Sequence, residues 1–163
     1  MTAPALWKEF EGNEVTHSVA HHLAAVHDLR EQHGYARVSD VARYLGITRG
    51  SASLTLKALR EKHYVQEDRN KFLSLSDKGH RIVHNVLAKR RIMETFLKEV
   101  LRVEEKQAEI DACKVEHLLS AEAGENLCHF VSFLLSETPA ARLLLEEYWR
   151  ERDSNPDSAS VPM

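Results

Sequence analysis

Three residue types that bind first-row transition metals occur together in the segment Asp111–His117. Cys113, Glu116 and His117 are spaced i, i+3 and i+4, so a helix would present a thiolate, a carboxylate and an imidazole on one face. The same spacing also fits an ordinary helix, in which the cysteine is a small buried residue, the glutamate is solvated and the histidine belongs to the core. Spacing alone therefore leaves a metal site and a purely structural helix as two open interpretations.

Histidines supply the other candidate ligands. His17 and His21 form an i, i+4 pair in a segment that favours a helix, so their imidazoles would share one face. His80 and His84 repeat this spacing later in the chain, where we expect both side chains to be exposed. The sequence contains no His-Glu-x-x-His motif, no phosphate-binding loop and no Gly-x-Ser-x-Gly motif, so we expect a protein that is not an enzyme.

Charge is distributed unevenly along the chain. The formal net charge is −3, yet the stretch from Arg37 to Lys98 holds 14 Lys or Arg residues against 6 Asp or Glu, and residues 101–163 hold 6 against 13. A basic block inside an acidic protein favours a nucleic-acid-binding module, because Lys and Arg replace the counterions condensed on phosphates. A basic face that is merely solvated is the alternative that charge alone leaves open.

The basic block carries the pattern of a helix-turn-helix. Ser39 is expected to cap a short helix over Asp40–Leu45, and Gly46 to end it. Thr48 is expected to cap a second helix that runs to about Lys62. The inward-facing positions of this second helix are Ala52, Leu56 and Leu59. Two short helices joined by a tight turn that contains glycine form the core of a helix-turn-helix.

The neighbouring segments predict a winged helix followed by further helices. A helix over Asn13–His33 precedes the helix-turn-helix, and two strand candidates, Tyr64–Glu67 and Lys71–Leu75, follow it as a wing. The later predicted helices are Ser76–Leu101, Glu104–Leu119, Ser120–Glu137 and Ala140–Arg152. The first of these has more apolar surface than one small module covers, so we expect part of it to meet a partner subunit. The tail from Ser154 is expected to be disordered.

In a helix-turn-helix the start of the second helix enters the major groove of DNA. Small hydroxyl residues there allow a close approach to the bases, and an arginine can donate two hydrogen bonds to guanine. The candidate base-contacting residues are Thr48, Arg49, Gly50, Ser51, Ser53 and Thr55. Candidate phosphate contacts, which position the protein without reading sequence, are Lys57, Arg60, Lys62, Arg69 and Lys71.

The fold class is therefore mainly α, with a winged helix-turn-helix followed by an all-helical domain. We expect the N-terminal helix and winged helix in residues 1–75, a helical domain in 76–137, and a C-terminal helix with a tail in 138–163. No apolar run reaches the ~18–20 residues of a membrane span, and no signal peptide is evident, so we expect a cytoplasmic protein with no membrane partner. Cys113 and Cys128 are expected to be reduced there, and Cys128 to be buried.

With these residues in view, the sequence resembles the diphtheria-toxin-repressor family of metal-dependent transcriptional regulators. It is most similar to the short two-domain branch that includes the manganese transport regulators. The similarity covers about Glu14–Glu137 and includes Gly34–Ala42 before the helix-turn-helix, Leu75–Gly79 after the wing, and the pattern Cys-x-x-Glu-His-x-x-Ser over Cys113–Ser120. The resemblance implies a homodimer that binds double-stranded DNA and whose helical domain serves metal binding and dimerisation.

Carried over by position, the main metal site of the family falls on His21, Cys113, Glu116 and His117, with His17 as a further candidate. Family members hold a methionine or an aspartate at the place of His21, so histidine is a departure that keeps a competent ligand. The manganese branch has an extra carboxylate where this chain has Ala24, and a carboxylate in place of Cys113. A thiolate with imidazoles is a softer set, which favours Fe²⁺ over Mn²⁺ and leaves Zn²⁺, Co²⁺ and Ni²⁺ able to bind.

The ancillary metal site of the family is altered in this chain. Its long-helix histidine aligns with Arg90 and another histidine with Glu109, whereas its glutamate is kept as Glu94. An arginine cannot ligate a metal, so we expect Arg90 to pair with Glu94 or Glu109 instead. Both glutamates remain further candidate ligands.

The residues and the resemblance together predict an Fe²⁺-dependent repressor that binds a palindromic operator as a homodimer and controls metal-homeostasis genes. Two alternatives remain. One is a metal-independent winged-helix regulator that senses oxidants through Cys113 and Cys128, or an organic effector. The other is an adaptor that uses its winged helix and its acidic C-terminal helices only for protein contacts.

Overall fold

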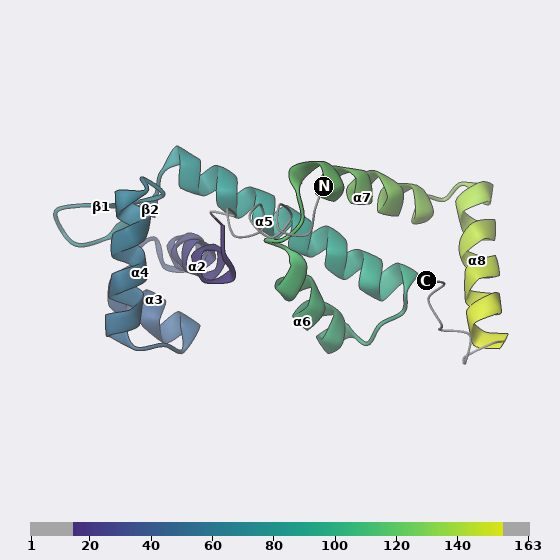
Figure 1. Cartoon of the computed structure of the whole chain (residues 1–163), viewed down its shortest axis with the longest axis horizontal. Helices are drawn as coiled ribbons and strands as arrows, with labels where there is room; N and C mark the ends of the chain where they lie inside the picture. The colour runs from purple at the N-terminus through teal and green to yellow at the C-terminus, as the bar shows by residue number, and fades with distance from the viewer. Residues whose placement is uncertain (1–14, 155–163) are drawn as a thin grey trace, which may run out of the picture. The chain divides into compact units, whose positions relative to one another are not determined.

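The computed structural model describes residues 15–154, and Figure 1 labels the helices and strands. In chain order they are α2 (His17–His33), α3 (Val38–Leu45), α4 (Arg49–Glu61), β1 (Val65–Glu67), β2 (Leu73–Leu75), α5 (Asp77–Thr95), η1 (Phe96–Val100), α6 (Glu105–Val115), α7 (Ala121–Leu134) and α8 (Pro139–Ser154). The predicted fold class, mainly α with a two-stranded wing, is confirmed. Within 15–154, no helix is long and apolar enough to cross a membrane. The tail expected to be disordered lies, from residue 155 on, outside the described residues.

The chain divides into two compact units. The first unit contains residues up to Lys89 together with Lys114–Leu118, and the second contains Arg90–Cys113 and the residues from Leu119 on. This division differs from the boundary expected after residue 75, because the first half of α5 packs with the winged helix. Val83 of α5 lies in the apolar core of the first unit, and Ile82 and Leu87 pack against that core.

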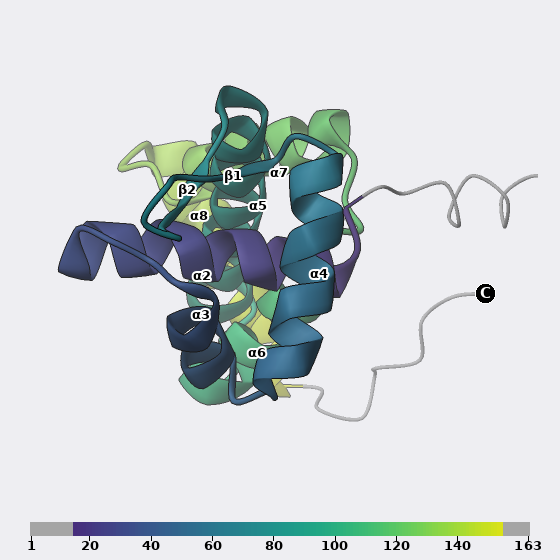
Figure 2. The same cartoon turned by 90° about the vertical axis from the view of Figure 1, so that its left-hand side faces the viewer.

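The first unit is a winged helix built around α2, α3 and α4. Figure 2 shows α2 running across α4, and α3 lies below α2 in that view. The inward positions predicted for α4 are confirmed, since Ala52, Leu56 and Leu59 are each exposed by 1% or less. They pack with Leu23 and Val26 of α2 in one apolar core, so α2 holds the second helix of the helix-turn-helix in place.

The two helices of the helix-turn-helix begin by different means. Thr48 caps α4 as predicted, because its Oγ1 accepts a hydrogen bond of 3.1 Å from the backbone N–H three residues on. The predicted cap of α3 was wrong, since Ser39 lies inside that helix. The helix begins one residue after Arg37, whose backbone N–H donates to Asp40 Oδ2 at 3.2 Å. The carboxylate that satisfies this end therefore belongs to the helix itself.

The wing is a short antiparallel hairpin in which Val65 of β1 is paired with Leu75 of β2. Asp68 closes its turn, because its Oδ1 accepts hydrogen bonds of 2.8 Å from the backbone N–H groups of both Asn70 and Phe72. The strands are shorter than the sequence predicted, and Lys71 lies in the turn with a φ of 65°.

Helix α4 ends on a left-handed residue that is not glycine. His63 has a φ of 58°, and its N–H donates to the carbonyl of Arg60 at 2.9 Å. Because a β-carbon costs roughly 1 kcal/mol in this conformation, His63→Gly is expected to raise the free energy of unfolding by about 0.5–1 kcal/mol. Urea denaturation measures the change. Lys62→Gly, one residue earlier at φ −80°, is the control and is expected to lower stability; equal effects at the two positions would contradict the explanation.

The second unit joins the end of α5 to α6, α7 and α8. The predicted continuous helix to Leu101 gives way after Thr95 to a π-helical turn, η1. Helix α8 satisfies the end of this turn, since Trp149 Nε1 donates to the carbonyl of Val100 at 2.8 Å and Arg152 donates to that of Leu101 at 2.9 Å. The C-terminal helix is thus part of the second unit and not a separate appendage.

Candidate metal centre and DNA-binding surface

Two histidines lie side by side at the start of α2. The rings of His17 and His21 have centroids 4.2 Å apart, and a nitrogen of each lies within 4.8 Å of the other. Thr16 caps the helix by accepting a hydrogen bond from Val19 N–H at 3.3 Å, which sets the first turn that carries His17. The i, i+4 spacing thus places two imidazoles on one face, as the sequence predicted.

The segment Lys114–Leu118 belongs to the same unit as α2 and contains two further candidate ligands. The ring of His117 lies 5.3 Å from that of His17, at 71°. The preceding residue, Glu116, is fully buried, with 0% of its surface exposed. A buried carboxylate is stable only where hydrogen-bond donors or cations offset its lost hydration. Three imidazoles and a buried carboxylate fit a divalent first-row metal ion.

Glu116 and His117 do not lie on a helix, contrary to the prediction. Helix α6 ends at Val115, and the N–H of Leu118 donates to the Val115 carbonyl at 2.9 Å, so the chain tightens into an i, i+3 turn. The shared helical face expected for Cys113, Glu116 and His117 is therefore replaced by a helix end followed by a turn. This turn gives Glu116 a buried position that helical periodicity does not indicate.

Cys113 lies in the last turn of α6 and is half-buried. Arg90 Nη2 donates a hydrogen bond to its Sγ at 3.6 Å, so the arginine at the ancillary-site position contacts the cysteine. Glu94, one predicted partner of Arg90, is paired with Lys98 at 3.8 Å. The other, Glu109, is exposed on α6.

Cys128 does not occupy the buried position that we expected. It is exposed on α7, whose neighbouring side chains Phe130 and Phe133 are themselves about half exposed. The apolar surface of α7 is thus only partly covered within a single chain, which explains why an apolar sequence context did not bury the cysteine.

The imidazole of His117 has a pKa below its usual value of 6.5, because burial disfavours its charged form and His17 adds repulsion. The unfolded chain therefore binds a proton at His117 more readily than the folded chain does. The free energy of unfolding is thus highest above pH 6.5, where the imidazole is neutral in both states, and it decreases as the pH falls below 6.5. We expect the metal-free protein to unfold at lower urea at pH 5.5 than at pH 7. The difference is expected to shrink in His117→Gln and to stay unchanged in His129→Gln, an exposed position on α7; identical pH responses in the two variants would overturn this.

The outer face of α4 carries the predicted DNA contacts. Arg49, Ser53 and Lys57 are spaced i, i+4 and i+8 and are all exposed, and so are Thr48, Gly50 and Ser51. Thr55 is only half exposed. The face is therefore open where the first turn of the helix would meet base edges.

The predicted phosphate contacts of the wing region are partly engaged within the protein. Glu67 of β1 forms ion pairs with both Arg60 and Lys71, the latter at 3.6 Å. Arg60 is half-buried in this pair, whereas the side chain of Lys71 is largely exposed, as is Arg69 at the wing tip. Lys62 follows α4 as its C-cap and is also exposed.

Sequence reasoning missed one residue on this face. Leu54 is 74% exposed and sits beside Ser53, five residues after Arg49, in the middle of the exposed face of α4. A large apolar side chain at such a place has no role in the core. The sequence indicates its exposure in one way only: Leu54 is two residues from both Ala52 and Leu56, so it does not share their inward-facing side of the helix.

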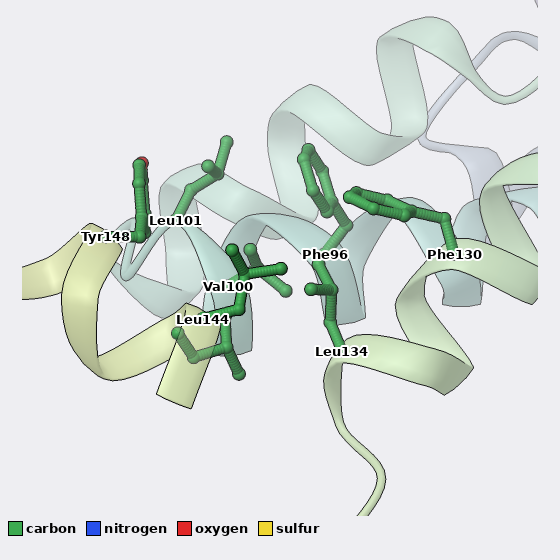
Figure 3. A pocket seen from close by; sticks show the side chains of 8 residues that line it. Phe96, Val100, Leu101, Phe130, Leu134, Leu144 and Tyr148 are labelled. Atoms are coloured by element: carbon green, nitrogen blue, oxygen red, sulfur yellow. The ribbon is translucent and has the colours of Figure 1, made fainter. Parts of the chain in front are cut away.

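The second unit contains an apolar pocket of about 270 Å³. Figure 3 shows the rings of Phe96 and Phe130 beside each other at one side of it. The lining residues are Phe96, Val100, Leu101, Phe130, Leu134, Leu144, Leu145 and Tyr148. They come from η1 and its C-cap Leu101, from α7 and from α8, so the π-helical turn faces the C-terminal helices across an apolar gap.

Comparison with protein families identifies both parts of the chain. Residues 14–73 match a model described as the iron dependent repressor, N-terminal DNA binding domain, and residues 76–139 match the iron dependent repressor, metal binding and dimerisation domain. Curated relatives include the HTH-type transcriptional regulators MntR of Shouchella clausii (28% identical over 118 residues, 72% of this chain and 82% of the relative) and of Lysinibacillus sphaericus (27% over 124 residues, 76% and 88%).

Solved structures share the fold at low sequence identity. The metal-dependent transcriptional regulator MtsR superposes with a TM-score of 0.65 (23% identical, 72% of this chain and 54% of that chain), and IdeR of T. acidophilum with 0.60 (22%, 71% and 54%). This chain therefore spans about half the length of these two structures. The two matched domains, in this order and on this fold, place the chain in the diphtheria-toxin-repressor family of iron-dependent repressors, in its MntR-like branch, as a metal-dependent transcriptional regulator.

Proposed function

We propose that this chain represses transcription in the cytoplasm by binding a palindromic operator as a homodimer when a divalent metal ion, Fe²⁺ foremost, occupies a site formed by His21, Cys113, Glu116 and His117. His17 is a further ligand in this proposal. The regulated genes would serve metal homeostasis, and the protein acts by binding rather than by catalysis.

The observation that carries this proposal is the burial of Glu116 next to His117, whose ring lies 5.3 Å from that of His17 in the histidine pair of α2. Carboxylates and imidazoles are both ligand types for first-row divalent ions, so Glu116, His117 and the histidines of α2 offer a compatible donor set. Cys113 joins the set by chain continuity, because it stands four residues before His117 and directly precedes the segment 114–118.

The donor set supports Fe²⁺ as the physiological ion. One thiolate, one carboxylate and imidazoles form a softer set than manganese sites prefer. Mn²⁺ is the second candidate, because a structural neighbour at 22% identity, SloR, is described as a manganese regulator. Affinities for the two ions, measured anaerobically on the same sample, decide between them.

A metal shared by α2 and the end of α6 would couple metal binding to DNA binding. Helix α2 packs directly against α4, which carries the exposed Arg49 face, so a constraint on α2 constrains α4. Dimeric repressors need their two reading helices about one DNA turn apart, roughly 34 Å. The metal can favour that arrangement only by the extra free energy with which it binds that arrangement rather than the others, typically about 1–3 kcal/mol.

Homodimerisation is supported by the uncovered apolar surface of α7 and α8. Phe130, Phe133 and Leu144 are each about half exposed, and Leu143 is 63% exposed. These residues lie in or just beyond the part of the chain that matches the metal binding and dimerisation domain. A second copy of the chain is the occupant that fits this surface, since burying such residues stabilises association.

The proposal is tested by operator binding as a function of metal. DNA selected from a random library by the Fe²⁺-loaded protein is expected to be palindromic, and a chelator is expected to weaken its binding by about 5- to 150-fold. Sedimentation equilibrium of the same sample is expected to give twice the 18.6 kDa chain mass. Chelator-insensitive binding, with a response to hydrogen peroxide in its place, would favour the thiol-sensing alternative.

Leu54 is expected to read a thymine methyl group. An exposed leucine on the DNA-facing side of α4 gains contact only with an apolar group, and the C5-methyl of thymine is the one that the major groove offers. Replacing operator thymines by uracil is expected to weaken binding about 3- to 5-fold at one position, in line with about 0.8 kcal/mol per buried methyl group. Leu54→Ala is expected to abolish this difference. A uracil effect that persists in this variant would assign the contact to another residue.

A further inference from the structure

A second group of histidines lies in the first unit, apart from the residues assigned above. It comprises His27 of α2 and His80 and His84 of α5, which the fold brings together across more than 50 residues of sequence. The ring centroids are 6.3 Å apart for His27 and His80, 5.8 Å for His27 and His84, and 6.2 Å for His80 and His84. Each imidazole therefore neighbours both of the others.

His27 is held in the tautomer that a metal ligand requires. Its Nδ1 lies 3.2 Å from Asp28 Oδ1, and because a carboxylate accepts hydrogen bonds, Nδ1 carries the proton. In the neutral ring, the Nε2 atom then keeps its lone pair. Tyr44 O–H donates to the other oxygen of Asp28 at 2.7 Å and so orients the carboxylate. A histidine whose second nitrogen donates to a carboxylate is the usual support of a metal-bound imidazole.

The three side chains also have the freedom to converge. His80 and His84 are exposed, whereas the side chain of His27 is only 20% exposed and is anchored by Asp28. Three imidazoles on one zinc ion, each with a Zn–N distance of about 2.0–2.1 Å, have ring centroids roughly 5 Å apart. Closing the observed spacing needs a movement of about 1 Å, which rotation of the two exposed rings about their side-chain bonds supplies.

We propose that His27, His80 and His84 form a second metal site that takes a borderline divalent ion of the zinc type, with water completing the coordination. Ligands that offer only imidazole nitrogen favour Zn²⁺, Cu²⁺, Ni²⁺ and Co²⁺ over Mn²⁺. His27 lies six residues from His21, which puts it on another face of α2, roughly 120° away. The two sites therefore share no ligand.

The ion connects α2 to the start of α5, two residues after the wing ends. Strand β2 ends at Leu75 and α5 begins at Asp77, so a metal held by His80 and His84 also restrains the wing hairpin relative to α2. Zinc at this site thus stabilises the winged helix itself, through a cross-link within one unit.

The test uses full-length chain in which the first site is disabled by His21→Ala and Cys113→Ala. Calorimetric titration of this metal-free protein with Zn²⁺ is expected to give one ion bound per chain. Saturation is expected to raise the Tm by about 5–10 °C. Adding His84→Ala is expected to weaken the binding at least tenfold and to remove the thermal shift. Adding His33→Ala, an exposed histidine in the last turn of α2, serves as the matched control and is expected to change neither.

Nitrogen chemical shifts identify the ligand atoms. On zinc binding, the Nε2 resonance of His27 is expected to move while its Nδ1 stays protonated. Failure of the disabled protein to bind zinc, or equal zinc affinity in the His84→Ala and His33→Ala forms, would overturn the proposal. The readouts are stoichiometry, Tm and chemical shift, so they stand apart from the proposed operator binding, which fails or succeeds on its own assay.

Discussion

Replacing Glu116 by glutamine is expected to weaken Fe²⁺ binding by at least about 100-fold and to remove the metal dependence of operator binding. Glutamine keeps the volume of this fully buried side chain and one of its oxygens, but it lacks the negative charge that holds a cation. Loss of a group that merely supports a metal ligand already costs 10- to 100-fold, so loss of a ligand charge costs more. Anaerobic metal titration and a DNA shift with and without chelator measure the two effects.

The matched control for this substitution is Glu125→Gln, an exposed glutamate on α7. It removes the same charge from the chain, so it corrects for any general electrostatic effect on DNA binding, and it is expected to leave both measurements unchanged. If Glu116→Gln kept full metal affinity, Glu116 would be a structural carboxylate and the proposed metal site would lose its central ligand. Its metal-free stability, measured in parallel, shows whether the substitution perturbs the fold.

Gly79→Ala is expected to lower the free energy of unfolding by about 3 kcal/mol, the upper range for overpacking a well-packed site. Gly79 lies in the first turn of α5, and a β-carbon there would overlap the backbone carbonyl of Tyr64, whose carbon lies 3.1 Å from it. The backbone cannot retreat, because Ser76 accepts a hydrogen bond from Gly79 N–H at 3.1 Å and donates one to the His63 carbonyl at 2.6 Å. Urea denaturation of the metal-free protein measures the loss.

Gly50→Ala provides the comparison for Gly79→Ala within the same unit. Gly50 is in the first turn of α4, and a β-carbon there would meet only Thr48 Oγ1 at an ordinary contact distance of 3.8 Å. Alanine favours the helix by about 0.5–1 kcal/mol over glycine, so this variant is expected to be more stable than the wild type. If both variants were destabilised by a similar amount, the close approach of Gly79 to the Tyr64 carbonyl would not be the reason that glycine is needed there.

The elements whose signals are local could be predicted from the amino-acid sequence. Thr48 caps α4, and Ala52, Leu56 and Leu59 face inward, because capping bonds and helical periodicity involve residues only three or four positions apart. The ligand types at Cys113, Glu116 and His117 were recognisable for the same reason, and the motif around them indicated the family. The order of winged helix and helical domain followed from these local patterns.

Features that depend on contacts between distant residues became visible in the fold alone. Helical spacing placed Glu116 on a helix face, yet α6 ends at Val115, and the turn that follows buries Glu116 and brings His117 beside His17 of α2, a hundred residues earlier. The cluster of His27, His80 and His84 arises in the same way, from packing of α5 against the winged helix. Burial and ring contacts between elements are set by which faces pack together, and a single sequence carries no local signal for that choice.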